Sequence, residues 1–127
     1  MVETMKRMYV EALFRNEDNE CYVVHVKSAC KYDLEQEVER LNAYNYKLVK
    51  CIITNNKVVS MKARLQFKIE ELGSLDENTD YYGYDETLVR NIGLLTSRLV
   101  RRGVEIKDEV AIQCYNIRQK RMMEHSV

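Results

Sequence analysis

The sequence predicts an α+β fold in the order ββαββαα, with an antiparallel four-stranded sheet packed by one short helix and a C-terminal helical hairpin. Some segments have the two-residue apolar period or the valine and isoleucine content of strands, and others repeat apolar residues at helical spacing. The 127 residues, 46% of them hydrophobic, are enough for one domain with a core and too few for two. We therefore predict a single domain over residues 1–127.

The first two predicted strands form a hairpin. Apolar side chains alternate with others along the first strand, at Met8, Val10, Ala12 and Phe14. After the polar stretch 16–20, the same period returns in a valine-rich run at Tyr22, Val24 and Val26. A two-residue period is typical of a strand with one buried face.

A short helix is predicted next. Asp33 can cap its first turn, and Gln36 occupies the capping-box position three residues later. Apolar residues recur at i, i+4 and i+7, at Leu34, Val38 and Leu41. This spacing predicts one apolar face, and the helix is expected to end between residues 42 and 45.

The second hairpin is predicted from the strongest periodicity in the chain. Between residues 59 and 69 every second residue is apolar, at Val59, Met61, Ala63, Leu65, Phe67 and Ile69. The preceding run, residues 46–54, is also strand-like, and Asn55 and Asn56 between the two runs predict a tight turn. The opposite face of the long strand would carry Ser60, Lys62, Arg64, Gln66 and Lys68, with Lys57 near the turn. These cations could contact phosphates or keep an exposed sheet face from aggregating.

Two longer helices are predicted to complete the fold after a polar connection, residues 73–83. The first begins at Asp85 and ends at Gly103, a left-handed cap, and its apolar seam is Leu88, Ile92, Leu95 and Leu99. The second begins near Asp108, and its apolar stripe is Val110, Cys114 and Ile117. Helices in this position would cover one face of the sheet.

The balance of basic and acidic residues excludes a strong electrostatic field around the whole protein. Twenty basic and twenty acidic residues cancel, so any attraction to nucleic acid or to an anionic membrane must be local. No run reaches the roughly 18 apolar residues of a membrane span, and the first residues lack the apolar core of a secretion signal. We therefore expect a cytoplasmic protein with no membrane contact, whose four cysteines are free thiols.

The spacing of the candidate residues does not fit a metal site or a catalytic motif. Residues of zinc-ligand type occur at Cys21, His25, Cys30 and Cys51. Two of them four residues apart on one strand would lie about 13 Å apart, whereas zinc holds its ligands at about 2.0–2.3 Å. A calcium-loop pattern begins at Asp76, Asn78 and Asp80, but Tyr81 then replaces the turn glycine and Thr87 the closing glutamate. Nucleophile motifs and phosphate-binding glycine loops are also missing, so we predict no metal, no cofactor and no enzyme activity.

One candidate binding site combines tyrosines with arginines around the first long helix. Its members are Tyr81, Tyr82, Tyr84, Arg90, Arg98, Arg101 and Arg102. Aromatic rings can stack on a base while guanidinium groups hold phosphates. At 100° per residue Arg90 and Arg101 nearly eclipse each other, opposite the apolar seam. The same arginines could equally form a solvated face paired with glutamates, and the tyrosines could pack under the loop or at a subunit contact.

Protein–protein binding is the other candidate function. Acidic residues gather at 35–39 and 76–80, apart from the arginines, and segregated charge favours self-association. Apolar residues off the helical seams would be buried by a partner, or else within the monomer, and they are Leu94, Ile112, Met122 and Met123. We predict a small binding module that acts on a protein and is a homo-oligomer, with nucleotide or nucleic-acid binding through the tyrosines and arginines as the alternative. By analogy at the level of the fold alone, it could be an accessory protein of a phage or mobile element that inhibits a host factor.

Overall fold

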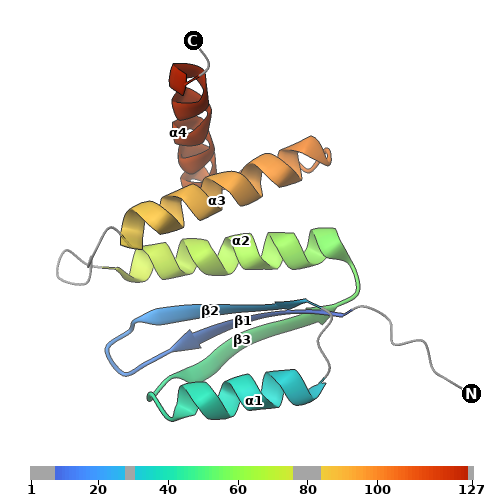
Figure 1. Ribbon diagram of the computed structural model, residues 1–127, viewed down its shortest axis with the longest axis vertical. Helices are drawn as coiled ribbons and strands as arrows, with labels where there is room; N and C mark the ends of the chain where they lie inside the picture. Colours follow the sequence, from blue (N-terminus) through green and yellow to red (C-terminus); the bar gives the residue numbers. More distant parts are fainter. Residues whose placement is uncertain (1–7, 28–30, 76–83, 126–127) are drawn as a thin grey trace, which may run out of the picture. The chain divides into compact units, whose positions relative to one another are not determined.

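The computed structural model describes residues 8–27, 31–75 and 84–125, and Figure 1 traces their order. The elements are β1 (Tyr9–Arg15), β2 (Cys21–Lys27), α1 (Lys31–Asn42), β3 (Lys47–Thr54), α2 (Lys57–Ser74), α3 (Tyr84–Arg101) and α4 (Glu109–His125). The chain divides into two compact units, residues 1–67 and 68–127, and the boundary lies within α2. The predicted α+β class is confirmed, but the observed order is ββαβααα.

β1 is the central strand of a three-stranded antiparallel sheet in the order β2-β1-β3. The predicted first hairpin is confirmed, because β1 pairs with β2 and places Glu11 opposite His25. On its other side β1 pairs with β3, where Glu11 lies opposite Ile52. Glu11 therefore lies in the middle of the sheet, between two neighbouring strands.

The sheet of the first unit is packed on both faces. On the face toward α1, Ala12, Phe14 and Val24 of the sheet are buried together with Leu41 of α1. The other face buries Leu13 and Cys21 together with Phe67 of α2. Figure 1 shows α1 and this part of α2 on opposite sides of the sheet.

α1 confirms the predicted short helix and its apolar face. Leu41 is 2% exposed, and the helix ends as expected, with Asn45 in the left-handed region at a φ of 66°. The N–H of Tyr46 donates to the carbonyl of Leu41 at 3.0 Å, which satisfies one of the last helical carbonyls. The helix begins at Lys31, and the side chain of Asp33, the predicted cap, lies outside the described residues.

The prediction of a fourth strand is wrong, because residues 57–74 form the helix α2. The sheet has three strands, and Asn55 and Asn56 do not connect a hairpin. Asn56 instead caps α2, since its Oδ1 accepts a hydrogen bond from the N–H of Val59 at 3.1 Å. Asparagine is favoured both in turns and at helix N-caps, so the residue type alone does not separate the two structures.

The burial of α2 on most of its sides explains why its two-residue apolar period resembles that of a strand. After the first residue, the exposed positions form one strip, Val59, Lys62, Gln66 and Gly73. This strip spans about 60° at 100° per residue. The buried positions on the rest of the helix include the polar Ser60 and Glu71 as well as Met61 and Leu65. A helix buried on most sides does not need the 3.6-residue polar and apolar pattern by which a surface helix is recognised.

The second unit contains α3 and α4, and the seam predicted for α3 is confirmed. Its four residues are at most 5% exposed, namely Leu88, Ile92, Leu95 and Leu99. Gly103 is the predicted left-handed cap, with a φ of 79°. The N–H of Val104 donates to the carbonyl of Leu99 at 3.1 Å, as this helix ending requires.

α4 begins where the sequence predicts it, because Oδ1 of Asp108 accepts a hydrogen bond from the N–H of Ala111 at 3.0 Å. Its predicted stripe is buried only in part: Cys114 is 4% exposed, whereas Ile117 is 41% exposed. Of the predicted connection, residues 73 and 74 belong to α2, and residues 76–83 lie outside the described residues. Among the described residues, none of the helices has the length and apolar character needed to cross a lipid bilayer.

Candidate functional site

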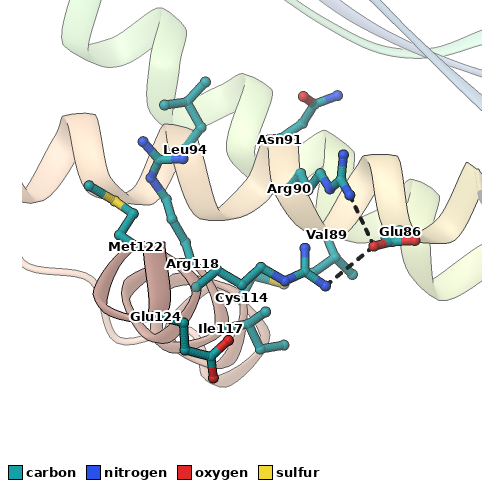
Figure 2. Close-up of a pocket in the computed structure, with 11 residues that line it drawn as sticks. Glu86, Val89, Arg90, Asn91, Leu94, Cys114, Ile117, Arg118, Met122 and Glu124 are labelled. Atoms are coloured by element: carbon teal, nitrogen blue, oxygen red, sulfur yellow. Dashed lines mark hydrogen bonds and ion pairs between the residues drawn. The ribbon is translucent and has the colours of Figure 1, made fainter. Parts of the chain in front are cut away.

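A groove lies between α3 and α4, which approach each other closely. At Gly93 a Cβ atom would lie 2.7 Å from the carbonyl oxygen of Cys114, so the backbones nearly touch at this point. The groove has a volume of about 780 Å³ and is lined from both helices, as Figure 2 shows. A glycine on α3 thus brings the side chains of α4 within reach of those of α3.

Three arginines and two glutamates supply the charge of the groove. Arg90 donates to Oε1 of Glu86 at 3.2 Å (Figure 2), and Arg121 donates to the same oxygen at 3.3 Å. The side chains of these three residues are all at least 43% exposed. Exposed ion pairs contribute at most about 1 kcal/mol each, so the anionic group of a ligand could replace Glu86 at small cost.

Arg118 is the arginine of the groove with an unsatisfied donor. Its Nε is buried and has no hydrogen-bond partner among the described residues. Figure 2 shows the side chain extending from α4 toward α3. A buried donor without an acceptor costs about 1–3 kcal/mol, and more when it is charged. Arg118 lines the groove, so a carboxylate or phosphate bound there would neutralise its charge beside this unsatisfied donor. Arg118 is therefore the best point in the groove for an anionic group.

The rest of the groove is largely apolar. Leu94 of α3 is half-buried, and Ile117 and Met122 of α4 are 41% and 47% exposed. Exposed methionine and aliphatic side chains beside arginine are typical of protein-binding surfaces. Burial, and secondarily the negative charge of Asp108, raises the pKa of the Cys114 thiol. The thiolate is therefore disfavoured, and Cys114 is not suited to nucleophilic catalysis.

The residues of the predicted tyrosine and arginine site are not all brought together. Arg90 lines the groove, whereas Arg98, Arg101 and Arg102 are exposed and are not part of its lining. Tyr81 and Tyr82 lie outside the described residues. Tyr84 is the first residue of α3, and its side chain also lies outside what the structure describes.

Sequence reasoning missed that Arg90 is joined by two arginines of α4. The sequence does contain a pattern for the part of the groove that α4 contributes. Its lining residues recur at i, i+3, i+4 and i+7, at Cys114, Ile117, Arg118 and Arg121. This spacing places them on one face of a helix. Which face of α3 they meet depends on the close approach at Gly93, which no local pattern reveals.

A second cluster of polar residues surrounds Glu11 in the first unit. The buried Oε1 of Glu11 accepts a hydrogen bond from Oγ of Ser60 at 2.7 Å and contacts Nδ1 of His25. Nε of Arg64 lies 4.0 Å from the same oxygen. Burial raises the pKa of the Glu11 carboxyl, while the Ser60 hydrogen bond and the electrostatic effects of His25 and Arg64 oppose this shift.

The Glu11 cluster is not arranged for nucleophilic catalysis. In a serine, histidine and carboxylate triad the imidazole lies between the hydroxyl and the carboxylate. Here the carboxylate of Glu11 lies between Ser60 and His25. Ser60 is 1% exposed, so a substrate cannot reach its hydroxyl. The cluster is a structural contact that joins β1, β2 and α2.

Within the described ranges, no group of three or more histidine, cysteine, aspartate or glutamate residues could hold a metal ion. Cys21, Cys51 and Cys114 are free thiols, and Cys30 lies outside the described residues. Comparison with models of protein families, with curated proteins and with solved structures finds no match to this chain.

Proposed function

We propose that this protein is a non-enzymatic binding module that holds a helical segment of a partner protein in the groove between α3 and α4. The observation that carries the proposal is the composition of the groove, in which apolar side chains of both helices lie beside an arginine with an unsatisfied donor. The fitting partner segment is an amphipathic helix with one acidic side chain near Arg118. Its apolar face would cover Leu94, Ile117 and Met122.

The packing chemistry of the groove supports a helix as the occupant. The groove between two packed helices accepts the ridge of side chains of a third helix, and amphipathic helices use their apolar face for this purpose. Met122 can adapt its shape to different neighbours. Arginines outnumber glutamates in the lining by three to two, so an acidic segment is favoured over a basic one.

Anion capture is the second candidate function, and the three arginines are the observation that favours it. Arg90, Arg118 and Arg121 could hold the phosphates of a nucleotide or nucleic acid if Glu86 gave up its ion pairs. The groove has no aromatic side chain among its described lining residues on which a base could stack. Phosphates would also leave the apolar wall unused, so a protein partner accounts for more of the lining.

We also propose that the protein is a homo-oligomer of the cytoplasm that inhibits its partner. Exposed apolar side chains outside the groove, such as Ile53 at 50% and Leu48 at 40%, support self-association. The free thiols of Cys21, Cys51 and Cys114 support a reducing compartment. A module that covers a helix of its partner would block the contacts which that helix makes elsewhere.

A display library of helix-forming peptides tests the first candidate. Peptides selected on the immobilised protein should share apolar residues at helical spacing and one acidic residue, and their dissociation constants can be measured by fluorescence anisotropy. Arg118→Gln and Ile117→Asp should each weaken binding about tenfold or more, which is about 1.4 kcal/mol. Arg101→Gln is the matched control, because Arg101 is exposed on α3 outside the groove lining, and it should leave the dissociation constant unchanged.

The salt dependence of binding separates the two candidates. Peptide binding through apolar contacts and one ion pair should weaken only modestly as salt is added. ATP and a single-stranded oligonucleotide serve as probes for anion capture, which should weaken steeply with salt. Binding of these probes that is lost in Arg118→Gln, with no peptide selected, would contradict protein recognition and support anion capture. Failure of both kinds of probe would contradict both candidates.

A further inference from the structure

β3 is an open edge of the sheet. Among the described residues it has a hydrogen-bonded neighbour, β1, on one side only. Six of its eight residues are exposed. An edge strand presents unpaired backbone N–H and C=O groups to any extended segment that reaches it. The large apolar side chains exposed along β3 are Leu48, Val49, Ile52 and Ile53, at 37–50%.

Residues 51–54 of β3 lack the protection that edge strands usually have. Charged side chains, prolines or a covering segment normally prevent an edge from pairing. β3 contains two lysines, Lys47 and Lys50, and residues 51–54 carry no charge. On β2, the other edge, the exposed large apolar residue is Tyr22, whose ring lies 6.0 Å from that of Tyr46. The apolar exposure is therefore concentrated at one edge of the sheet.

The regular part of β3 begins at Lys50. Leu13 of β1 pairs with Lys50, but its neighbour Phe14 pairs with Leu48, so Val49 is left out of the ladder as a bulge. The five residues 50–54 are in continuous register with β1. A bulge twists an edge away from further pairing, so residues 50–54 are the stretch that can accept another strand.

Residues 50–54 are complementary to a second copy of themselves. In two identical antiparallel strands related by a two-fold axis, residues that face each other must lie on the same face of the sheet. The axis therefore passes between the two copies of one residue, which face each other. An axis at Lys50 would oppose two lysines, which is unfavourable, and an axis at Cys51 would draw the bulge into the ladder. An axis at Ile52 opposes Ile52 to itself, Cys51 to Ile53 and Lys50 to Thr54. Only this last register pairs the whole regular stretch without opposing like charges.

We propose that a second copy of this chain covers β3, and that the two β3 strands pair antiparallel about a two-fold axis at Ile52. The joint sheet then has the order β2-β1-β3-β3-β1-β2. This inference rests on the proposed self-association and is independent of the groove between α3 and α4. One strand ladder with a few apolar side chains is a small interface compared with those of obligate dimers. The dimer is therefore expected to dissociate on dilution.

Sedimentation velocity over a wide range of concentrations, combined with hydrogen exchange, tests the pairing. The unmodified protein should show a monomer–dimer equilibrium, and the amides of residues 50–54 should become more protected as the dimer fraction rises. Ile52→Lys opposes two lysines at the axis and should weaken dimerisation about tenfold or more. Ile112→Lys is the matched control, because Ile112 of α4 is 39% exposed and Ile52 is 37% exposed. It should leave the dimer unchanged.

A second variant keeps the test valid if Ile52→Lys does not fold. Ile53 lies on the opposite face of β3 and pairs with Val10 rather than with Glu11, so Ile53→Lys should also weaken the dimer, and circular dichroism checks both folds. A monomer at every concentration would overturn the pairing and the proposed self-association together. A dimer that survives both β3 substitutions, or that Ile112→Lys disrupts equally, would overturn the pairing while self-association through another surface stands.

Discussion

Oγ of Ser60, near the start of α2, donates a 2.7 Å hydrogen bond to Oε1 of Glu11 on β1, 49 positions earlier in the chain. Glu11 is fully buried and Ser60 is 1% exposed, so water cannot easily replace either partner. His25 on β2 contacts the same carboxylate oxygen. One buried carboxylate therefore holds together two strands and a helix of the first unit.

Ser60→Ala should lower the free energy of unfolding by about 1–3 kcal/mol, because it removes a hydrogen bond from a buried carboxylate that has no water to replace it. Urea unfolding followed by circular dichroism at neutral pH measures the change. Ser74→Ala is a suitable control, since Oγ of Ser74 donates to the carbonyl of Glu71 within its own helix and is only partly buried. Equal effects of the two substitutions would contradict the role assigned to Ser60.

The buried carboxyl of Glu11 also predicts how stability depends on pH. Burial raises its pKa above the ordinary value of 4.5. The folded protein then binds this proton more tightly than the unfolded chain does. The contribution of Glu11 to the free energy of unfolding is therefore largest below pH 4.5 and falls as the pH rises through the raised pKa. Glu11→Gln removes this titration and keeps an oxygen that can accept the Ser60 hydrogen bond.

Urea unfolding at a series of pH values from about 4.5 to about 8 measures the effect of Glu11→Gln. The free energy of unfolding of the variant, relative to that of the unmodified protein, should increase with pH across this range. Glu17→Gln removes an exposed carboxylate from the turn after β1 and controls for the loss of surface charge. Curves for Glu11→Gln and the unmodified protein that stay parallel would show that Glu11 does not titrate as its burial requires.

The Glu11 cluster also explains where the sequence was informative and where it was not. The hairpin of β1 and β2 could be predicted because the alternation along each strand is local, although β1 is buried on both faces. Ser60 and Arg64 resemble the solvated face of a strand when only their neighbours are considered. They lie instead on a helix, beside a carboxylate contributed by a distant strand. No local pattern contains that partner, so the period of residues 59–69 was assigned to the wrong element.

Only part of the candidate groove could be predicted from the sequence. The seam of α3 and the caps at Gly103 and Asp108 follow from residues near in sequence. The meeting of Arg90 with Arg118 and Arg121 depends on how two helices cross, which the residue spacing within either helix does not specify.

The assignment of Asn56 as the cap of α2 can be tested against the predicted hairpin turn. Asn56→Ala should lower the free energy of unfolding by about 1 kcal/mol, because it removes the acceptor of the Val59 N–H. Asn55→Ala is the matched control, since Asn55 is exposed and precedes the cap, and it should change stability by less than about 0.5 kcal/mol. Chemical denaturation measures both. A loss at Asn55 as large as that at Asn56 would favour a two-residue turn.

The close approach of α3 and α4 predicts opposite effects for two glycine-to-alanine substitutions. In Gly93→Ala the new Cβ would lie 2.7 Å from the carbonyl oxygen of Cys114, and a backbone atom cannot rotate away as a side chain can. Overpacking of this kind costs about 1–3 kcal/mol, which exceeds the gain of about 1 kcal/mol that alanine brings to a helix. Gly93→Ala should therefore destabilise the protein and weaken ligand binding in the groove.

Gly73→Ala on α2 should instead raise the free energy of unfolding by up to about 1 kcal/mol, because a Cβ there meets no atom within 4 Å and only the helix propensity changes. Thermal unfolding of the two variants beside the unmodified protein measures both changes. If Gly93→Ala stabilised the protein as much as Gly73→Ala does, the two helices could not cross at Gly93. Arg118 and Arg121 of α4 would then not lie beside Arg90, and the groove proposed as the binding site would not form.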